Sequence, residues 1–152
     1  MSTVAVTRLI DAPVTAVWRV FTDLAGRREW LTAVTGVEVR SRGPFGTGTV
    51  WRETRRMADG GEVTEEFRVL ECAEPERFVV VSPGIGADYR MTYSFAPVSS
   101  GRHSGGTTVT VVQDGNPTKP AGRILALLFG GLAAETAEGA LRRDLDDLAA
   151  VA

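Results

Sequence analysis

The sequence predicts a single α+β domain in which a curved antiparallel sheet wraps round a long C-terminal helix. Three observations predict it: apolar residues at 3- and 4-residue steps from Lys119 to Ala150, period-two alternation in several segments between Gly36 and Asp114, and two short helical patterns after the first strand. A chain of 152 residues can bury a substantial core, and one domain over residues 1–152 accounts for all of it.

The N-terminal segment predicts a strand followed by two short helices. Residues 4–10 predict the strand, with Val4, Val6 and Arg8 on one face and Ala5, Thr7 and Leu9 on the other. Asp11 is a typical N-cap, with Pro13 suited to the first helical turn. The apolar face of that helix consists of Val14, Val17, Trp18 and Phe21. Residues 27–34, which include Trp30, predict the second helix.

Six further strands are predicted by period-two alternation and by the turn residues between them. Their ranges are 37–42, 49–57, 63–72, 77–82, 89–97 and 107–114. With the first strand they predict an antiparallel sheet of about six to seven strands.

Charge predicts the register of the hairpin 49–72. If Ala58 opposes Val63, three opposite-charge pairs face each other across the strands. These pairs are Arg56 with Glu65, Arg55 with Glu66, and Glu53 with Arg68. The predicted loop then has four residues, Asp59 to Glu62.

The C-terminal helix has two unlike halves. Ile124 to Ala134 is apolar on nearly all sides, so we expect other parts of the fold to cover it on more than one side. The second half carries a charged face that we expect to be solvated, comprising Glu138, Arg142, Arg143, Asp144, Asp146 and Asp147.

Composition excludes several classes of function. The net charge of −2, with no block of like charges, argues against nucleic acid or an anionic membrane as a partner. A single cysteine, Cys72, excludes an internal disulfide, and no apolar run is long enough to span a membrane. The lone histidine, His103, lies in a polar turn, which argues against a catalytic triad or a histidine metal site. We expect a cytoplasmic protein without a metal or cofactor.

Several sequence patterns resemble one known superfamily. They are Ile-Asp-Ala-Pro at 10–13, Val-Trp at 17–18, Asp-Leu at 23–24, Trp30, Glu-Pro-Glu-Arg-Phe at 74–78, Tyr-Ser-Phe-Ala-Pro at 93–97 and Gly-Thr-Thr-Val-Thr at 106–110. This combination resembles the START-like (SRPBCC) superfamily, in its polyketide cyclase/dehydrase and lipid transport group. The resemblance implies a helix-grip fold that encloses an elongated apolar cavity. Because the superfamily includes lipid carriers, plant-hormone binders and aromatase/cyclases, the fold does not decide the function.

Large side chains are directed to the space between sheet and helix in this prediction. Apolar and aromatic linings are typical of ligand pockets, although the same residues could fill the space as ordinary core. The predicted ligand-cavity residues are Trp30, Trp51, Phe67, Tyr89, Met91, Tyr93, Phe95, Leu125, Leu128 and Phe129. Tyr89 and Tyr93 are the expected polar anchors, because a phenol adds one hydrogen-bonding group to an apolar wall.

The candidate catalytic residues are Glu53, Arg55 and Tyr93. If Glu53 and Arg55 enter the cavity beside Tyr93, they could polarise a carbonyl or move a proton during cyclisation or dehydration of a poly-β-keto substrate. The alternative, which the sequence favours, is a set of exposed cross-strand ion pairs of small energetic value.

Three functions remain open from the sequence. The first, which we expect, is binding or transport of a hydrophobic small molecule such as a lipid, an isoprenoid or a polyketide. The second is a cofactor-independent cyclase, aromatase or dehydratase. The third is an interaction module that uses the apolar segment 124–132 to form a homodimer or to bind a partner protein.

Overall fold

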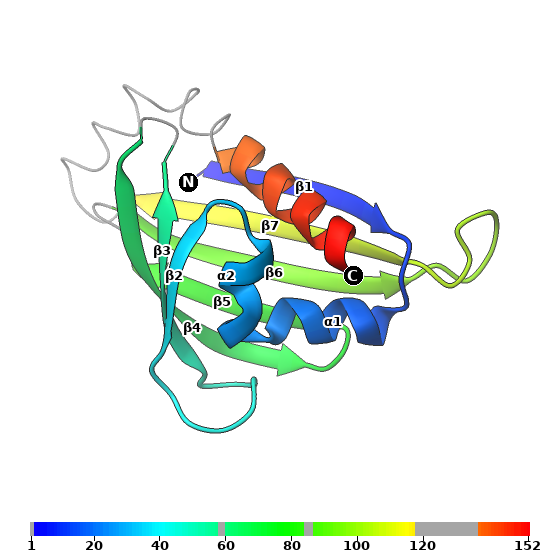
Figure 1. Ribbon diagram of the computed structural model, residues 1–152, viewed down its shortest axis with the longest axis horizontal. Helices are drawn as coiled ribbons and strands as arrows, with labels where there is room; N and C mark the ends of the chain where they lie inside the picture. The colour runs from blue at the N-terminus through cyan, green and yellow to red at the C-terminus, as the bar shows by residue number, and fades with distance from the viewer. Residues whose placement is uncertain (1, 58–59, 84–86, 118–136) are drawn as a thin grey trace.

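A seven-stranded antiparallel sheet dominates the computed structural model, which describes residues 2–57, 60–83, 87–117 and 137–152 (Figure 1). The strand order is β1-β7-β6-β5-β4-β3-β2. The strands are β1 (Ser2–Ile10), β2 (Val34–Val39), β3 (Val50–Arg56), β4 (Glu62–Ala73), β5 (Arg77–Pro83), β6 (Ala87–Pro97) and β7 (Thr107–Pro117). The predicted α+β class and strand number are confirmed.

The helices lie on one side of the curved sheet (Figure 1). They are α1 (Val14–Thr22), the 3-10 turn η1 (Leu24–Gly26), α2 (Arg27–Trp30) and a C-terminal helix at 137–151. The helix-grip arrangement is confirmed for this described part. Residues 119–136 of the predicted long helix, including the apolar segment 124–132, lie outside the described residues.

Two details of the short helices differ from the prediction. Pro13, in an extended conformation, is the N-cap of α1 and makes no side-chain capping bond, so the N-cap prediction for Asp11 is wrong. The helix α2 ends at Trp30 rather than Val34, because the buried Leu31 is already extended and β2 begins at Val34.

Aromatic side chains fill the inner side of the sheet beneath α1. The Trp18 ring contacts Phe95 and Phe78 at centroid distances of 5.2 and 5.6 Å in edge-on geometry. Phe21 lies 4.8 Å from the ring of Tyr93. Edge-on and tilted contacts of this kind favour dense packing. This part of the inner face is therefore core rather than open space.

The C-terminal helix buries one apolar stripe on the sheet. Leu141, Leu145 and Leu148 are 8, 2 and 0% exposed, at the 4- and 3-residue spacing of a single helix face. This stripe confirms the apolar pattern predicted for the second half of the helix. Within the described part of the chain, no helix combines the length and apolar character needed to cross a bilayer.

The predicted register of the β3–β4 hairpin is wrong by three residues. In the structure Trp51 pairs with Phe67, Glu53 with Glu65 and Arg55 with Val63. The Trp51 and Phe67 rings stack at 5.2 Å, and the Thr54 and Thr64 hydroxyls meet at 2.8 Å. The charge argument failed because it assumed that Glu53 needs a cross-strand partner, whereas Glu53 faces the interior.

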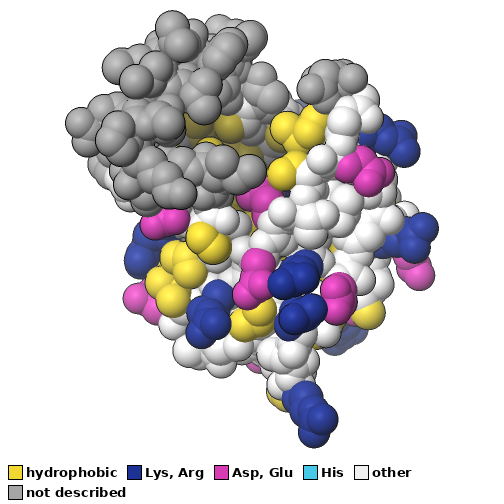
Figure 2. All heavy atoms as spheres, turned by 90° about the vertical axis from the view of Figure 1, so that its left-hand side faces the viewer, with side chains coloured by type: hydrophobic (Ala, Val, Ile, Leu, Met, Phe, Trp, Pro, Cys, Tyr) yellow, Lys and Arg dark blue, Asp and Glu magenta, His cyan; other side chains and the backbone are white. Residues whose placement is uncertain are grey.

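The observed register separates two faces of the hairpin. Trp51, Glu53, Glu65 and Phe67 share the inner face, while the outward Arg52 and Glu66 form an exposed ion pair at 3.3 Å. Basic and acidic side chains are interspersed on the side of the molecule that lies at the left of Figure 1 (Figure 2). The predicted cross-strand charge pairing therefore occurs on the outer face, with different partners.

Candidate functional site on the inner face of the sheet

Arg27 and Glu53 form a buried ion pair between α2 and β3. The two residues are only 4 and 2% exposed, and Arg27 Nε donates to Glu53 Oε1 at 2.7 Å. Arg55 Nε donates to the other oxygen, Oε2, at 2.9 Å. Each carboxylate oxygen of Glu53 is therefore held by a guanidinium group.

Arg55 extends the cluster to the C-terminal helix. Its Nη1 and Nη2 donate to Oδ1 and Oδ2 of Asp144 at 3.1 and 2.7 Å. This parallel two-bond geometry is the strongest form of an arginine–carboxylate contact. With Arg27 and Glu53 it completes a cluster of two positive and two negative charges, so the cluster is neutral.

Aromatic rings enclose the guanidinium of Arg27. Its central carbon lies 5.0, 5.9 and 6.0 Å from the ring centres of Phe21, Trp30 and Trp51. Its Nη1 also donates to the Phe21 carbonyl oxygen at 3.3 Å. Ring faces attract a cation, and here they replace water around the buried charge.

The electrostatics keep this cluster ionised. Burial alone would raise the pKa of Glu53, but the charges of Arg27 and Arg55 outweigh it and lower that pKa. Burial would likewise lower the pKa of Arg55, but Asp144 and Glu53 raise it. A carboxylate with a lowered pKa and two bound guanidinium groups is a weak base.

Sequence reasoning missed half of the cluster. Arg27 gave no signal, because its partner lies 26 residues away on another element. Asp144 was expected on the solvated face of the helix, but its side chain is only 13% exposed and paired with Arg55. The expectation that Glu53 and Arg55 belong to exposed ion pairs is also wrong, since their side chains are 1 and 19% exposed.

Tyr93 lies beside the cluster as a neutral hydrogen-bond donor. Its ring stacks on Phe78 at 4.8 Å, and within the described residues its hydroxyl has only the Met91 sulfur, at 3.7 Å, as an acceptor. Burial raises the pKa of Tyr93 to about 12, with Asp144 adding to the effect and Arg27 opposing it. Tyr93 nevertheless keeps some accessible surface. Tyr93 shares its face of β6 with the buried Met91 and Phe95, so its side chain is directed to the inner side of the sheet.

The described ligand-cavity candidates gather on the inner face. Trp51, Phe67, Met91 and Phe95 are 4, 9, 7 and 2% exposed, while Trp30, Tyr89 and Tyr93 are half-buried. Leu125, Leu128 and Phe129 lie outside the described residues. Among the described residues, the buried indole Nε1 atoms of Trp30 and Trp51 have no hydrogen-bond partner. The inner wall is thus apolar, with donors that lack acceptors.

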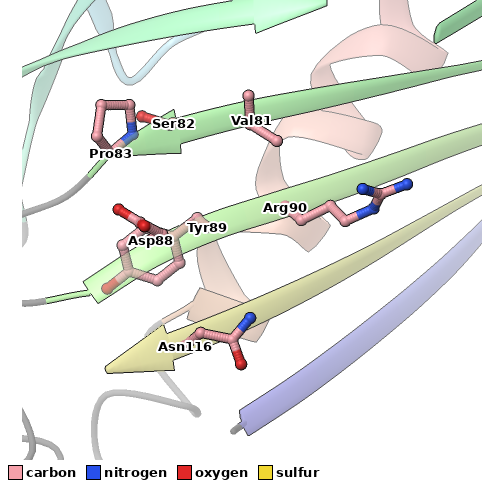
Figure 3. Close-up of a pocket in the computed structure, with 7 residues that line it drawn as sticks. All are labelled: Val81, Ser82, Pro83, Asp88, Tyr89, Arg90 and Asn116. Atoms are coloured by element: carbon pink, nitrogen blue, oxygen red, sulfur yellow. The ribbon is translucent and has the colours of Figure 1, made fainter. Parts of the chain in front are cut away.

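A pocket of about 300 Å³ lies at the ends of β5, β6 and β7 (Figure 3). Its lining is Val81, Ser82, Pro83, Asp88, Tyr89, Arg90 and Asn116. None of these residues belongs to the buried charge cluster. We place the candidate site at the cluster and its aromatic wall, because the two partnerless indole donors lie there.

Metal chemistry has no evident centre in the described residues. Among them, no three histidine, cysteine or acidic side chains gather as metal ligands. His103 is exposed in the turn between β6 and β7, as its polar neighbours predicted.

A family model described as polyketide cyclase / dehydrase and lipid transport matches residues 1–152. The fold is similar to that of the di-domain ARO/CYC BexL from the BE-7585A biosynthetic pathway, with 21% identity and a TM-score of 0.78. That alignment covers 97% of this chain and 48% of BexL, so this chain spans about half the length of that protein.

Two similar structures match over nearly their whole length. A START superfamily protein from Mycobacterium smegmatis has 16% identity and a TM-score of 0.77, with 97% of this chain and 94% of that chain covered. The protein TTHA0849 from Thermus thermophilus has 27% identity and a TM-score of 0.72, with 99% of both chains covered. A search of curated proteins found no match.

Proposed function

The chain belongs to the polyketide cyclase / dehydrase and lipid transport family, and on that premise we propose that it binds a hydrophobic small molecule against the inner face of its sheet. One observation carries the proposal. The indole N–H groups of Trp30 and Trp51 are buried in an aromatic wall and have no acceptor within the part of the chain that the structure describes. An unpaired buried donor costs about 1 to 3 kcal/mol, which a ligand oxygen would recover.

The same wall defines the ligand in chemical terms. The charge cluster beside it is neutral overall, with both oxygens of Glu53 and both of Asp144 already held. It therefore leaves no net charge to attract a ligand ion. The Tyr93 hydroxyl has only a weak sulfur acceptor. We infer a neutral, ring-rich ligand with a carbonyl or ether oxygen facing these donors.

Native mass spectrometry of the freshly purified protein is the first experiment. We expect a stoichiometric apolar adduct, and denaturing extraction would then give its class. A clean mass of the bare protein, together with no uptake of 2-acetylnaphthalene in fluorescence titrations, would contradict the proposal.

Two substitutions locate the binding site. We expect 2-acetylnaphthalene to bind more tightly than its isostere 2-ethylnaphthalene, which lacks the carbonyl. Trp51→Phe and Tyr93→Phe should reduce that advantage about two- to twelvefold, since each removes one donor. Tyr89→Phe is the matched comparison, because Tyr89 is the other predicted anchor. Loss of the advantage only in Tyr89→Phe would move the anchor to the strand ends.

A second candidate function is a cofactor-independent cyclase or dehydratase. The observation that favours it is the inward position of Arg55 and Tyr93, two donors that could stabilise a developing enolate oxygen. In this proposal Glu53 positions the guanidinium groups of Arg27 and Arg55. Incubation with a poly-β-ketothioester should then yield a product that has lost water. Unchanged turnover in both Glu53→Gln and Tyr93→Phe would count against the catalytic role.

A further inference from the structure

Glu65 is an inward-facing carboxyl group that the charge cluster leaves unused. It lies on β4 directly opposite Glu53, on the face that carries Trp51 and Phe67. Both oxygens of Glu53 are engaged by arginines. Among the described residues, Glu65 forms no ion pair within 4 Å, and the Ser82 hydroxyl is the side-chain group that approaches its carboxyl.

Ser82 is a second unused polar group near Glu65. The residue is 1% exposed, and its buried Oγ has no hydrogen-bond partner of acceptable geometry among the described residues. Arg68 pairs with Val81 across β4 and β5, so Ser82 lies level with Phe67, one inward position from Glu65. The Ser82 hydroxyl is close enough to lower the pKa of Glu65, although the geometry falls short of a hydrogen bond.

Ser82 lies on the inner face of the sheet near the end of β5. Its cross-strand neighbour on that face is Tyr89, whereas the pocket of about 300 Å³ is lined mainly from the opposite face, by Val81, Asp88, Arg90 and Asn116 (Figure 3). Buried polar groups are almost always hydrogen-bonded. A buried hydroxyl without a well-formed hydrogen bond, beside a carboxyl that no arginine holds, therefore has the character of a site for a polar ligand atom.

We propose that Glu65 and Ser82 form a hydrogen-bonding subsite on the inner face of the sheet, which takes a hydroxyl group of an otherwise apolar ligand. The Glu65 carboxyl accepts the ligand's O–H, and Ser82 Oγ donates to the ligand oxygen. This subsite deepens the proposed function and rests on it. It adds a hydroxyl-specific contact to the carbonyl-specific donors near Arg27.

The electrostatic surroundings of Glu65 leave its carboxyl available to a ligand. Burial raises the pKa of Glu65, while Arg55 opposes the effect and Glu53 adds to it. A carboxyl that no guanidinium holds keeps free lone pairs for a ligand hydroxyl. Glu53, with its lowered pKa, is the opposite case on the neighbouring strand.

Three probes of similar shape distinguish binding at the subsite from binding to the apolar wall. Naphthalene offers only a ring system, 2-methoxynaphthalene adds an acceptor, and 2-naphthol adds a hydroxyl donor. Fluorescence titration of the full chain should give 2-naphthol an affinity about two- to twelvefold above that of 2-methoxynaphthalene. Glu65→Leu should remove most of that ratio and leave naphthalene affinity within about twofold.

Two further variants keep the test decisive. Glu66→Leu changes the next carboxylate on the same strand, which faces outward to Arg52, and should leave the ratio intact. Ser82→Ala removes a hydroxyl that has no partner, so it should fold even where Glu65→Leu does not, and it should lower the ratio. A ratio that is unchanged in both Glu65→Leu and Ser82→Ala overturns the subsite alone. Failure of all three probes to bind overturns the proposed function and the subsite with it.

Discussion

Arg55 on β3 joins Asp144 on the C-terminal helix through two hydrogen bonds of 3.1 and 2.7 Å. The two residues are 89 positions apart in the chain. Their side chains are 19 and 13% exposed, so solvent screens this pair only weakly. The contact fixes the helix to the strand that also carries Glu53, and thereby positions the helix over the candidate site.

Substitution of Asp144 should cost far more stability than substitution of its neighbour Asp146. Asp144→Asn removes one of the two carboxylates that hold Arg55 and leaves Glu53 as its remaining charged partner, which we expect to cost roughly 3 kcal/mol. Asp146 pairs with Arg8 at 3.3 Å, but their side chains are 65 and 48% exposed. Asp146→Asn should therefore change stability by less than about 1 kcal/mol. Urea denaturation midpoints measure both, and equal losses would contradict the assigned role of Asp144.

The Arg27–Glu53 pair should show strong coupling in a double-mutant cycle. Arg27→Met and Glu53→Leu each leave a buried charge with fewer partners, at a cost of about 3 to 5 kcal/mol. The double variant should lose less than the sum, with a coupling energy of about 1 to 3 kcal/mol. Urea titrations give the free energies of unfolding of the parent protein, the two single variants and the double variant. Additive losses would mean that the two side chains are energetically independent.

Glu53 and Glu65 should affect the pH dependence of stability with opposite signs. The lowered pKa of Glu53 means that its stabilisation is present above its ordinary pKa of 4.5 and is lost as the pH falls through the folded-state pKa. The raised pKa of Glu65 means that its ionised form destabilises the fold above that pKa, whereas below 4.5 the penalty disappears.

The measurement is a pair of stability profiles from about pH 3 to about pH 8. Glu53→Gln should lose stability at neutral pH, and the loss should shrink in acid. Glu65→Gln should gain stability at neutral pH, and the gain should vanish in acid. Profiles of the same sign for both variants would refute the assignment of two unlike environments.

Two glycines should respond oppositely to alanine. A Cβ at Gly106 would lie 2.9 Å from the Ile10 carbonyl oxygen and 3.0 Å from that of His103, both of which are backbone atoms. Gly106→Ala should therefore destabilise the fold by about 1 to 3 kcal/mol. Gly139 in the C-terminal helix has open space around its Cβ position, so Gly139→Ala should stabilise by up to about 1 kcal/mol. Thermal unfolding of the two variants tests both signs.

The sequence predicted the elements well because each has a local cause. The period-two pattern of β6 predicted its inner face, and Met91 and Phe95 are buried there as expected. The stripe of Leu141, Leu145 and Leu148 likewise predicted the buried face of the C-terminal helix. Alternation and helical spacing are properties of short segments, so they are visible without knowledge of the fold.

The register of β3 against β4 could not be obtained in the same way. Opposite charges predicted Glu53 facing Arg68, but the structure pairs Glu53 with Glu65 and stacks Trp51 on Phe67. Two carboxylates can face each other here because Arg27 and Arg55 neutralise one of them. Arg27 arrives from a helix, so no comparison of the two strands alone could reveal this.

The sequence by itself determined the α+β class, the order of the elements and the apolar faces, because these depend on side-chain periodicity over a few residues. Only the tertiary structure decided which charges are buried. Arg27, Glu53, Arg55 and Asp144 come from α2, β3 and the C-terminal helix, and they meet through contacts that span up to 89 positions. Whether a charged side chain is solvated or paired depends on what packs over it, and that is set by the whole fold.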